Sequence, residues 1–178
     1  MDKINISYFK TPYGELVLGD FRNELCLCDW RYRKMRPEID KRIKDGLNAE
    51  FSEELTPLIE LLKLQLNEYF EGKRKAFELP LLMVGSDFQK SVWNELLKIP
   101  FGKTVSYLKL SQQLGNEKAI RAVASANGAN AISILVPCHR IIGSDGSLTG
   151  YAGGLTTKKK LLQLEGSLKT DSQLKLFI

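Results

Sequence analysis

The 178-residue sequence has few of the residues that build disulfide frameworks and metal sites, with three cysteines and a single histidine. Reduced thiols in such small number are typical of a cytoplasmic protein. Cys26 and Cys28 alternate along one predicted strand with no other His or Cys nearby, so they cannot complete a zinc site. We expect both to point to one face of the strand as core residues. The sequence therefore predicts no metal site and no disulfide.

Long apolar runs are also missing from the sequence. No run approaches the ~18 apolar residues of a membrane span, and residues 1–5 have no apolar signal-peptide core. These absences argue against membrane contact and favour a cytoplasmic location. Hydrophobic residues make up 43% of the chain and charged residues 26%, a composition that suits one or two globular domains.

Positive charge is concentrated in the second half of the chain. Residues 1–84 hold 14 Lys and Arg against 15 Asp and Glu, for a net charge of −1. Residues 85–178 hold 12 Lys and Arg against 6 Asp and Glu, for a net charge of +6. Such asymmetry favours a nucleic-acid partner, although an ordinary basic domain has the same balance.

The first half of the sequence is predicted to form a small mixed α/β domain. Apolar alternation between turn residues predicts short strands over residues 4–9, 15–18 and 21–30. A charged loop with a short helix is expected over residues 31–48. A longer helix is expected over residues 52–71, with Ser52 as its N-cap and Gly72 at its end.

The second half is predicted to be helical. Ser86 or Asp87 caps a first helix, and Ser106 caps a second one. After a tight turn at residues 115–116, a third helix is expected over residues 117–126. Two short helices joined by a turn that contains glycine match a helix-turn-helix pattern, which many DNA-binding domains share.

The third predicted helix lacks side chains that read bases. Its end, residues 122–126, holds only alanine, valine and serine, whereas a major-groove reader needs Arg, Asn or Gln. Arg121 is the one long cation in its middle. The helix is therefore expected either to dock on DNA without reading the sequence or not to bind DNA.

The adjacent residues Cys138 and His139 are the strongest indication of nucleophilic chemistry in the sequence. A thiolate is a nucleophile, and a nearby imidazole or cation lowers the pKa of a thiol. Neighbouring side chains in an extended segment point opposite ways, so we expect the pair to couple through a turn or a bridging water. Glu165, the only acid in the helical stretch 158–165, is the candidate to orient the imidazole. The residues alone leave open a buried, inert cysteine.

The run Pro137-Cys138-His139-Arg140 stands between two apolar segments. Four further blocks surround it in the sequence: FQKSVW at 88–93, IPFGKTVSY at 99–107, RAV at 121–123 and GYAGGL at 150–155. Together, and in this order, they resemble the O6-alkylguanine-DNA alkyltransferases, also called methylated-DNA–protein-cysteine methyltransferases. The resemblance covers nearly all of residues 86–166, whereas the first half matches only loosely.

The resemblance implies a role for each matching residue. Cys138 would accept the alkyl group, His139 would take the thiol proton through a water, and Glu165 would orient His139. Tyr107 would stand near the flipped base, and Asn130 would join the DNA-binding helix to the active-site turn. The other implied contacts are minor-groove docking by Ala124, Ser125 and Ala126, filling of the base stack by Arg121, and a guanine pocket made by Ile141, Tyr151, Ala152 and Gly153.

The resemblance also implies the fold class, which is α+β. A small ribonuclease-H-like mixed α/β domain would cover residues 1–84. A helical winged-helix or helix-turn-helix domain would cover residues 85–168, and residues 169–178 would form a tail. Two departures from the family pattern are Ala131, where the family often has Pro, and Ala152, where some members have Ser.

The activity implied by the resemblance is direct transfer of the alkyl group from O6-alkylguanine, and from O4-alkylthymine, to Cys138. The substrate would be double-stranded DNA, and the damaged base would leave the stack before it reacts. No cofactor is implied, because the DNA itself carries the alkyl donor. The thioether product lies outside reversible thiol chemistry, so each monomer would act once.

Two other functions are compatible with the same residues. A non-catalytic module that binds lesions and recruits other repair proteins would use the helix-turn-helix and Arg121 but would not need Cys138. A thiol hydrolase would use Cys138, His139 and Glu165 and would turn over many times. The alkyl-transfer interpretation fails if Cys138 is sealed from any cavity and lies far from His139.

Overall fold

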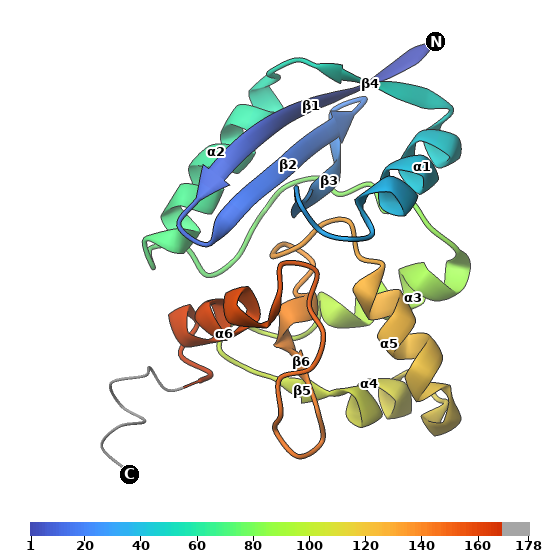
Figure 1. The fold of residues 1–178 in the computed structure, drawn as a ribbon, viewed down its shortest axis with the longest axis vertical. Helices are drawn as coiled ribbons and strands as arrows, with labels where there is room; N and C mark the ends of the chain where they lie inside the picture. The colour runs from blue at the N-terminus through green and yellow to red at the C-terminus, as the bar shows by residue number, and fades with distance from the viewer. Residues whose placement is uncertain (169–178) are drawn as a thin grey trace.

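The structure, a computed structural model, describes residues 1–168, and the predicted tail at 169–178 lies outside these residues. A sheet with two helices forms one half of the molecule, and short helices form the other (Figure 1). The first half contains β1 (Asp2–Thr11), β2 (Gly14–Phe21), β3 (Glu24–Trp30), α1 (Arg36–Leu47), β4 (Ala49–Glu53) and α2 (Pro57–Phe70). The second half contains α3 (Asp87–Leu96), β5 (Val105–Ser106), α4 (Tyr107–Gln113), the 3-10 turn η1 (Glu117–Ala119), α5 (Ile120–Gly128), the 3-10 turn η2 (Cys138–Arg140), β6 (Ile141–Ile142) and α6 (Leu155–Leu164).

The four-stranded sheet has the order β3-β2-β1-β4, with β1 antiparallel to β2 and parallel to β4. The predicted strands of the first half are confirmed. A bulge between β2 and β3 leaves Cys26 without a partner opposite it, and Cys26 and Cys28 belong to different core clusters. The prediction that both thiols share one face is therefore wrong, because a bulge breaks the alternation, whereas their burial in the core is confirmed.

The predicted helix at 52–71 starts later than the sequence suggested. Ser52 lies in β4, which pairs in parallel with β1, so Ser52 is not an N-cap. Thr56 caps α2 instead, because its hydroxyl accepts a hydrogen bond from the amide of Ile59 at 3.2 Å. Pro57 takes the first helical position, where its missing N–H has no effect on the helix.

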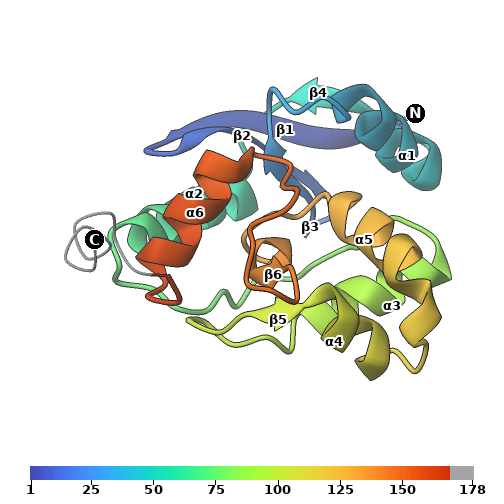
Figure 2. The same ribbon diagram turned by 60° about the horizontal axis from the view of Figure 1, so that its bottom comes forward.

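The capped helices of the second half are confirmed. Ser86 and Gln89 form a reciprocal capping box at the start of α3, and Ser106 caps α4. The third predicted helix begins with η1 and continues as α5, which packs against both α3 and α4. Figure 2 shows these three helices grouped on one side of the molecule, below the sheet.

The strand β3 lies at the edge of the sheet, and its outer side connects the two halves through backbone hydrogen bonds. Leu25 exchanges hydrogen bonds with the connection after α2, to the amide of Leu82 and the carbonyl of Pro80. Cys28 does the same with the loop after α5, where its amide donates to Ala131 and its carbonyl accepts from Ser133. The edge of the sheet is thus covered by the segment that leads to Cys138.

One hydrophobic core extends across both halves. Buried side chains from β2, β3 and α2 belong to the same cluster as side chains from α3, α5 and α6. Each fully buried leucine in it, such as Leu62 or Leu161, contributes about 1.5–3 kcal/mol relative to an exposed one. The predicted division after residue 84 falls in the connection between α2 and α3. Within residues 1–168, no helix is long and apolar enough to cross a bilayer.

Candidate active site

Cys138 is the first residue of η2 and lies at the wall of a cavity of about 270 Å³. The residue is only 3% exposed, yet it lines the cavity together with Tyr107 and Tyr151. The other residues that line this cavity are Arg33, Lys34, Met35, Ala124, Asn127, Gly128, Gly150 and Ala152. The thiol is therefore buried at the edge of a space that a small organic group can enter.

Burial raises the pKa of the Cys138 thiol above its ordinary value. Hydrogen bonding from Asn130 and the positive charges of Lys158 and Arg33 lower the pKa, but these effects are smaller than the effect of burial, and Asp29 adds to the increase. Nearby cations lower the pKa of this thiol, as the sequence analysis expected, but the effect of burial is larger. A protonated thiol needs a base before it can react as a nucleophile.

His139 and Glu165 meet in the interior, as the sequence predicted. The Nε2 atom of His139 lies 2.7 Å from Oε1 of Glu165, and both side chains are fully buried. Burial lowers the pKa of His139, so its imidazole is neutral at pH 7. Since Nε2 faces the carboxylate, the proton belongs on Nε2, and Nδ1, which has no partner in the described structure, is the basic atom.

Glu165 accepts more hydrogen bonds than the sequence indicated. Arg140 donates to both of its oxygens, at 2.8 and 2.9 Å, and the hydroxyl of Tyr69 donates to Oε1 at 2.8 Å. Although burial raises the pKa of Glu165, the hydrogen bonds from His139 and Arg140 lower it to about 2. Tyr69 lies in α2 and was not among the residues that the sequence singled out. The position of Arg140 directly after Cys138-His139 was the one available signal for its role.

Asn130 closes the turn that leads from α5 to Cys138. Its Nδ2 donates to the carbonyl of Val136 at 2.9 Å, and its Oδ1 accepts from the amide of Ile132 at 2.9 Å. These two bonds hold the loop although Ala131 stands where the family often has Pro. The position expected for Asn130, between the helix and the active-site turn, is the one observed.

Tyr107 and Lys158 support the loop that forms the opposite wall of the cavity. The Tyr107 hydroxyl donates to the carbonyl of Thr149 at 3.2 Å, and Nζ of Lys158 donates to the carbonyls of Thr149 at 3.1 Å, Gly150 at 3.3 Å and Ile141. Burial lowers the pKa of Lys158 to about 8. Sequence reasoning missed Lys158, although its spacing to the apolar residues of α6 places it on the buried face.

The four residues expected to form a guanine pocket separate into two pairs. Tyr151 and Ala152 line the cavity beside Cys138. Ile141 is fully buried in β6, where it pairs with Val105, and it does not line the cavity. Gly153 packs against the indole of Trp30, so close that a Cβ there would lie 2.8 Å from the ring. Ile141 and Gly153 thus do not line the cavity beside Cys138, although Gly153 lines a neighbouring cavity with Tyr151 and Ala152, and their place in a guanine pocket stays a prediction.

On α5, the residues expected to touch DNA differ in exposure. Arg121 and Ser125 are exposed, and Ala124 is half-buried at the cavity. Ala126 is buried, and its carbonyl accepts a hydrogen bond from the indole of Trp93 at 2.8 Å, so its side chain is not part of an exposed face. Successive residues of a helix point in different directions, which a three-residue match in the sequence does not reveal. Asn127, which sequence reasoning missed, lines the cavity instead.

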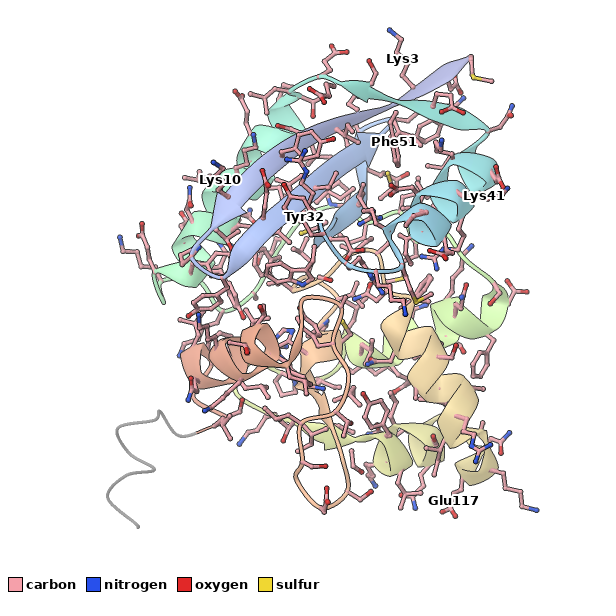
Figure 3. The ribbon with its side chains drawn as sticks, in the orientation of Figure 1. Lys3, Lys10, Tyr32, Lys41, Phe51 and Glu117 are labelled. Carbon is pink, nitrogen blue, oxygen red and sulfur yellow. The ribbon has the colours of Figure 1, made fainter. Side chains whose placement is uncertain are left out.

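Three cavity residues come from the first half of the chain, in the loop between β3 and α1. Arg33, Lys34 and Met35 line the cavity, and their neighbour Tyr32 is exposed in the same loop (Figure 3). This position was not predictable, because residues 31–48 read in the sequence only as a charged loop with a short helix. Among residues 1–168, no cluster of His, Cys, Asp and Glu has the arrangement of a metal site.

Each half of the chain matches one domain of the same protein family. Residues 4–83 match the family described as "6-O-methylguanine DNA methyltransferase, ribonuclease-like domain". Residues 87–167 match the family described as "6-O-methylguanine DNA methyltransferase, DNA binding domain". The two matches together extend over nearly the whole described chain.

Relatives of known identity are similar over the same length. A methylated-DNA–protein-cysteine methyltransferase of Methanosarcina barkeri is 54% identical over 156 residues, which cover 88% of this chain and 93% of that protein. The protein of the same description from Methanosarcina acetivorans is 42% identical over 159 residues, which cover 89% of this chain and 96% of that protein. These alignments include both halves of the structure.

Solved structures agree with the sequence comparisons. The O6-methylguanine methyltransferase of Mycobacterium tuberculosis has a TM-score of 0.76 and 36% identity, with 100% of both chains covered. The structure of the OGT protein from the same organism in complex with DNA has a TM-score of 0.77 and 35% identity, with 99% of both chains covered. By its two domains, its relatives and its fold, this chain belongs to the methylated-DNA–protein-cysteine methyltransferase family.

Proposed function

We propose that the chain repairs DNA by moving the alkyl group of O6-alkylguanine onto Sγ of Cys138. The observation that carries this proposal is the position of the thiol at the wall of a cavity, next to a buried His139–Glu165 pair. A thiol in a cavity can meet a base that has left the helix, and the imidazole can accept its proton. Family membership supplies the reaction, and the geometry supplies the candidate residues.

The reaction is a direct displacement at the alkyl carbon. His139 Nδ1 accepts the thiol proton through a bridging water, and the imidazolium is stabilised by Glu165, which stays ionised. The S–C bond of the thioether forms as the C–O6 bond of the base breaks. The guanine then takes up one proton at O6 or N3 and leaves as a neutral base. Tyr107, whose side chain lines the cavity and whose hydroxyl donates to the Thr149 carbonyl, is the proposed proton donor.

The DNA is proposed to bind along α5 and to present the damaged base to the cavity. Ala124 and Ser125 allow close approach of the helix, and Arg121 occupies the space that the flipped base leaves in the stack. The net charge of +6 in residues 85–178 favours contact with phosphates, so affinity falls as salt rises. Action on O4-alkylthymine, a monomeric state and a cytoplasmic location stay predictions from the sequence.

A titration with labelled DNA tests the proposed function. Duplex DNA with one O6-methylguanine labelled in the methyl group is added in excess, and the label on protein and on DNA is counted. We expect one methyl group on each chain and no transfer from a second addition of substrate, because a thioether does not release its alkyl group. Binding without loss of label from the DNA supports a lesion-binding module instead. Repeated turnover supports a hydrolase.

Replacing Arg121 with alanine is expected to slow transfer from duplex DNA while transfer from the free base O6-methylguanine stays close to wild type. Flipping costs a few kcal/mol, so losing the residue that fills the stack slows the duplex reaction about tenfold or more. Single-turnover rates on the two substrates measure the effect. Lys118→Ala, which removes another exposed cation just before α5, is the matched control. An equal loss on both substrates argues against a stack-filling role.

A further inference from the structure

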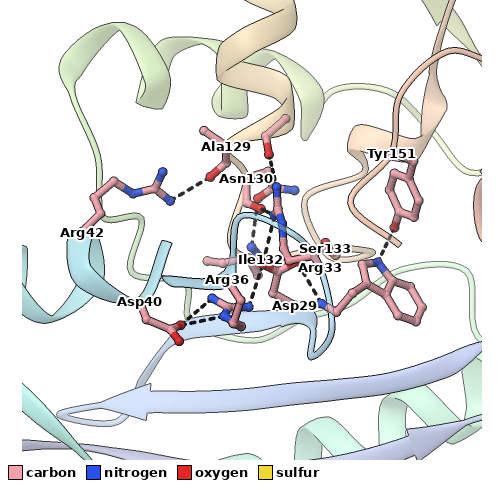
Figure 4. A network of polar contacts seen from close by, with 12 residues as sticks. Asp29, Arg33, Arg36, Asp40, Arg42, Ala129, Asn130, Ile132, Ser133 and Tyr151 are labelled. Carbon is pink, nitrogen blue, oxygen red and sulfur yellow. Dashed lines mark hydrogen bonds and ion pairs between the residues drawn. The ribbon is translucent and has the colours of Figure 1, made fainter. Parts of the chain in front are cut away.

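A buried cluster of charges lies at the end of β3 and in the loop that follows it (Figure 4). The Asp29 side chain has no exposure, and its Oδ2 accepts hydrogen bonds from Arg33 at 3.0 Å and from Arg36 at 2.8 Å. Its Oδ1 accepts from the hydroxyl of Ser133 at 3.2 Å and from the amide of Trp30 at 2.9 Å. The carboxylate of Asp29 therefore fixes the orientations of the Arg33, Arg36 and Ser133 side chains.

Arg33, held by Asp29, reaches from the first half of the chain to the end of α5. Its Nη2 donates to the carbonyl of Gly128 at 2.5 Å and its Nη1 to the carbonyl of Asn130 at 3.2 Å. Arg42 of α1 donates to the carbonyl between them, Ala129, at 2.7 Å. Helix C-termini leave carbonyls without intrahelical partners and favour nearby positive charge. Two arginines of the first half thus satisfy three successive carbonyls, beginning with that of the last residue of α5.

These carbonyls belong to the segment that places the acceptor thiol. The side chain of Asn130 holds the turn through Ile132 and Val136, and hydrogen bonding from Asn130 is the strongest influence that lowers the pKa of Cys138. Arg33 itself also lines the cavity and is among the charges that lower that pKa. A continuous series of contacts leads from Asp29 through Arg33 and Asn130 to the thiol.

A merely stabilising role explains this cluster less well. Burying an ion pair costs desolvation energy, and apolar residues of similar size often stabilise a protein as much or more. What apolar residues cannot supply is a planar set of donors that reaches two carbonyls and a carboxylate at once. The side chain of Arg33 is only 5% exposed and makes all three of these contacts.

We propose that Arg33, oriented by Asp29, is a positioning residue for alkyl transfer. It fixes the turn of Asn130 against the sheet and thereby aligns Cys138 with the cavity. The first half of the chain then sets the reactivity of a thiol that lies in the second half. This inference rests on the proposed transfer to Cys138.

Three variants test the positioning role. Arg33→Lys keeps the charge but replaces the planar set of donors with a single ammonium group. Arg33→Leu removes the donors, and Asp29→Leu combined with Arg33→Leu removes both charges of this ion pair and leaves Arg36 paired with Asp40. Arg22→Leu breaks the exposed ion pair with Asp2 in the same half and serves as the matched control. For each protein, the unfolding free energy, the Kd for unmodified duplex and the first-order transfer rate at saturating alkylated duplex are measured.

We expect Arg33→Lys and the double variant to stay folded, to bind unmodified duplex like wild type and to transfer the alkyl group about tenfold more slowly or worse at saturation. The free base should show the same loss, because the thiol and not DNA docking is affected. Wild-type transfer rates in these two variants, or a rate loss that only follows the unfolded fraction, would overturn the positioning role. If wild type and Arg22→Leu transfer no alkyl group, the proposed function itself fails.

Discussion

Replacing Cys138 with serine is expected to abolish alkyl transfer and to leave DNA affinity near that of wild type. A serine hydroxyl is a much weaker nucleophile than a thiol, and His139 cannot compensate for the difference. The residue lies in the cavity wall and not on the exposed face of α5, so its replacement does not change the proposed DNA contacts. Transfer is measured with labelled duplex, and affinity is measured by titration of the unmodified duplex.

Cys26→Ala is the control for this experiment. The Cys26 thiol is buried near the carbonyl of Gly19, and burial raises its pKa to about 12, so it takes no part in thiolate chemistry at neutral pH. The control protein should therefore transfer one alkyl group per chain. Transfer by Cys138→Ser at the wild-type rate would show that another residue is the acceptor.

Replacing Glu165 with glutamine is expected to produce the largest loss of stability. Glu165 is the shared acceptor for Arg140, Tyr69 and His139, and its loss leaves the Arg140 charge buried without a counter-charge. Breaking a buried ion pair by removing one partner costs about 3–5 kcal/mol. Transfer by the folded fraction should also slow, because His139 loses the carboxylate that orients it. Urea unfolding gives the free-energy difference, and single-turnover rates give the effect on chemistry.

Acid provides a second test of the role of Glu165. Its pKa is lowered from an ordinary 4.5 to about 2 in the folded protein. The stabilising contribution of its charge is therefore complete above pH 4.5 and is lost as the pH falls toward about 2. The difference in unfolding free energy between wild type and Glu165→Gln should shrink over this interval. A difference that does not change with pH would mean that the lost stability comes from packing and not from charge.

Glu95→Gln is the matched control, because Glu95 of α3 pairs with the exposed Lys98 just after the helix. Exposed ion pairs contribute about 0–1 kcal/mol, so this change should have little effect on unfolding. Equal losses in Glu95→Gln and Glu165→Gln would contradict the special role of the buried carboxylate.

Elements with local signals were predictable from the sequence, and elements that depend on distant partners were not. Ser86 and Ser106 begin helices in the structure as predicted, because a capping side chain bonds to an amide only three residues away. The strand β4 was missed, since its pairing with β1 joins segments far apart in the sequence. Because β4 was not predicted, the helix α2 was expected to begin too early, at Ser52.

The residues of the candidate site were also only partly predictable from the sequence. The sequence predicted that Glu165 meets His139, because few acids near the motif were available, and the structure places them 2.7 Å apart. Burial was not predictable from a motif, so Ala126 and Ile141 were expected to face ligands although both lie in the core. A motif gives the position of a residue in the chain but not the direction of its side chain.

Buried charges were the least predictable features. Lys158 lies within a run of three lysines, which in a sequence is typical of a solvated surface. Arg33 lies in a similarly charged segment. Both are buried because backbone carbonyls of distant loops accept their hydrogen bonds, and no pattern in the sequence reports where those carbonyls lie.

Peptide mass mapping shows which sulfur receives the alkyl group, and we expect it to be that of Cys138. The protein is incubated with duplex DNA that contains O6-methylguanine, digested, and analysed by mass spectrometry. We expect one added methyl group on the peptide that contains Cys138 and unmodified peptides for Cys26 and Cys28. A methyl group on either of those two cysteines, or on no cysteine while the DNA is repaired, would contradict it.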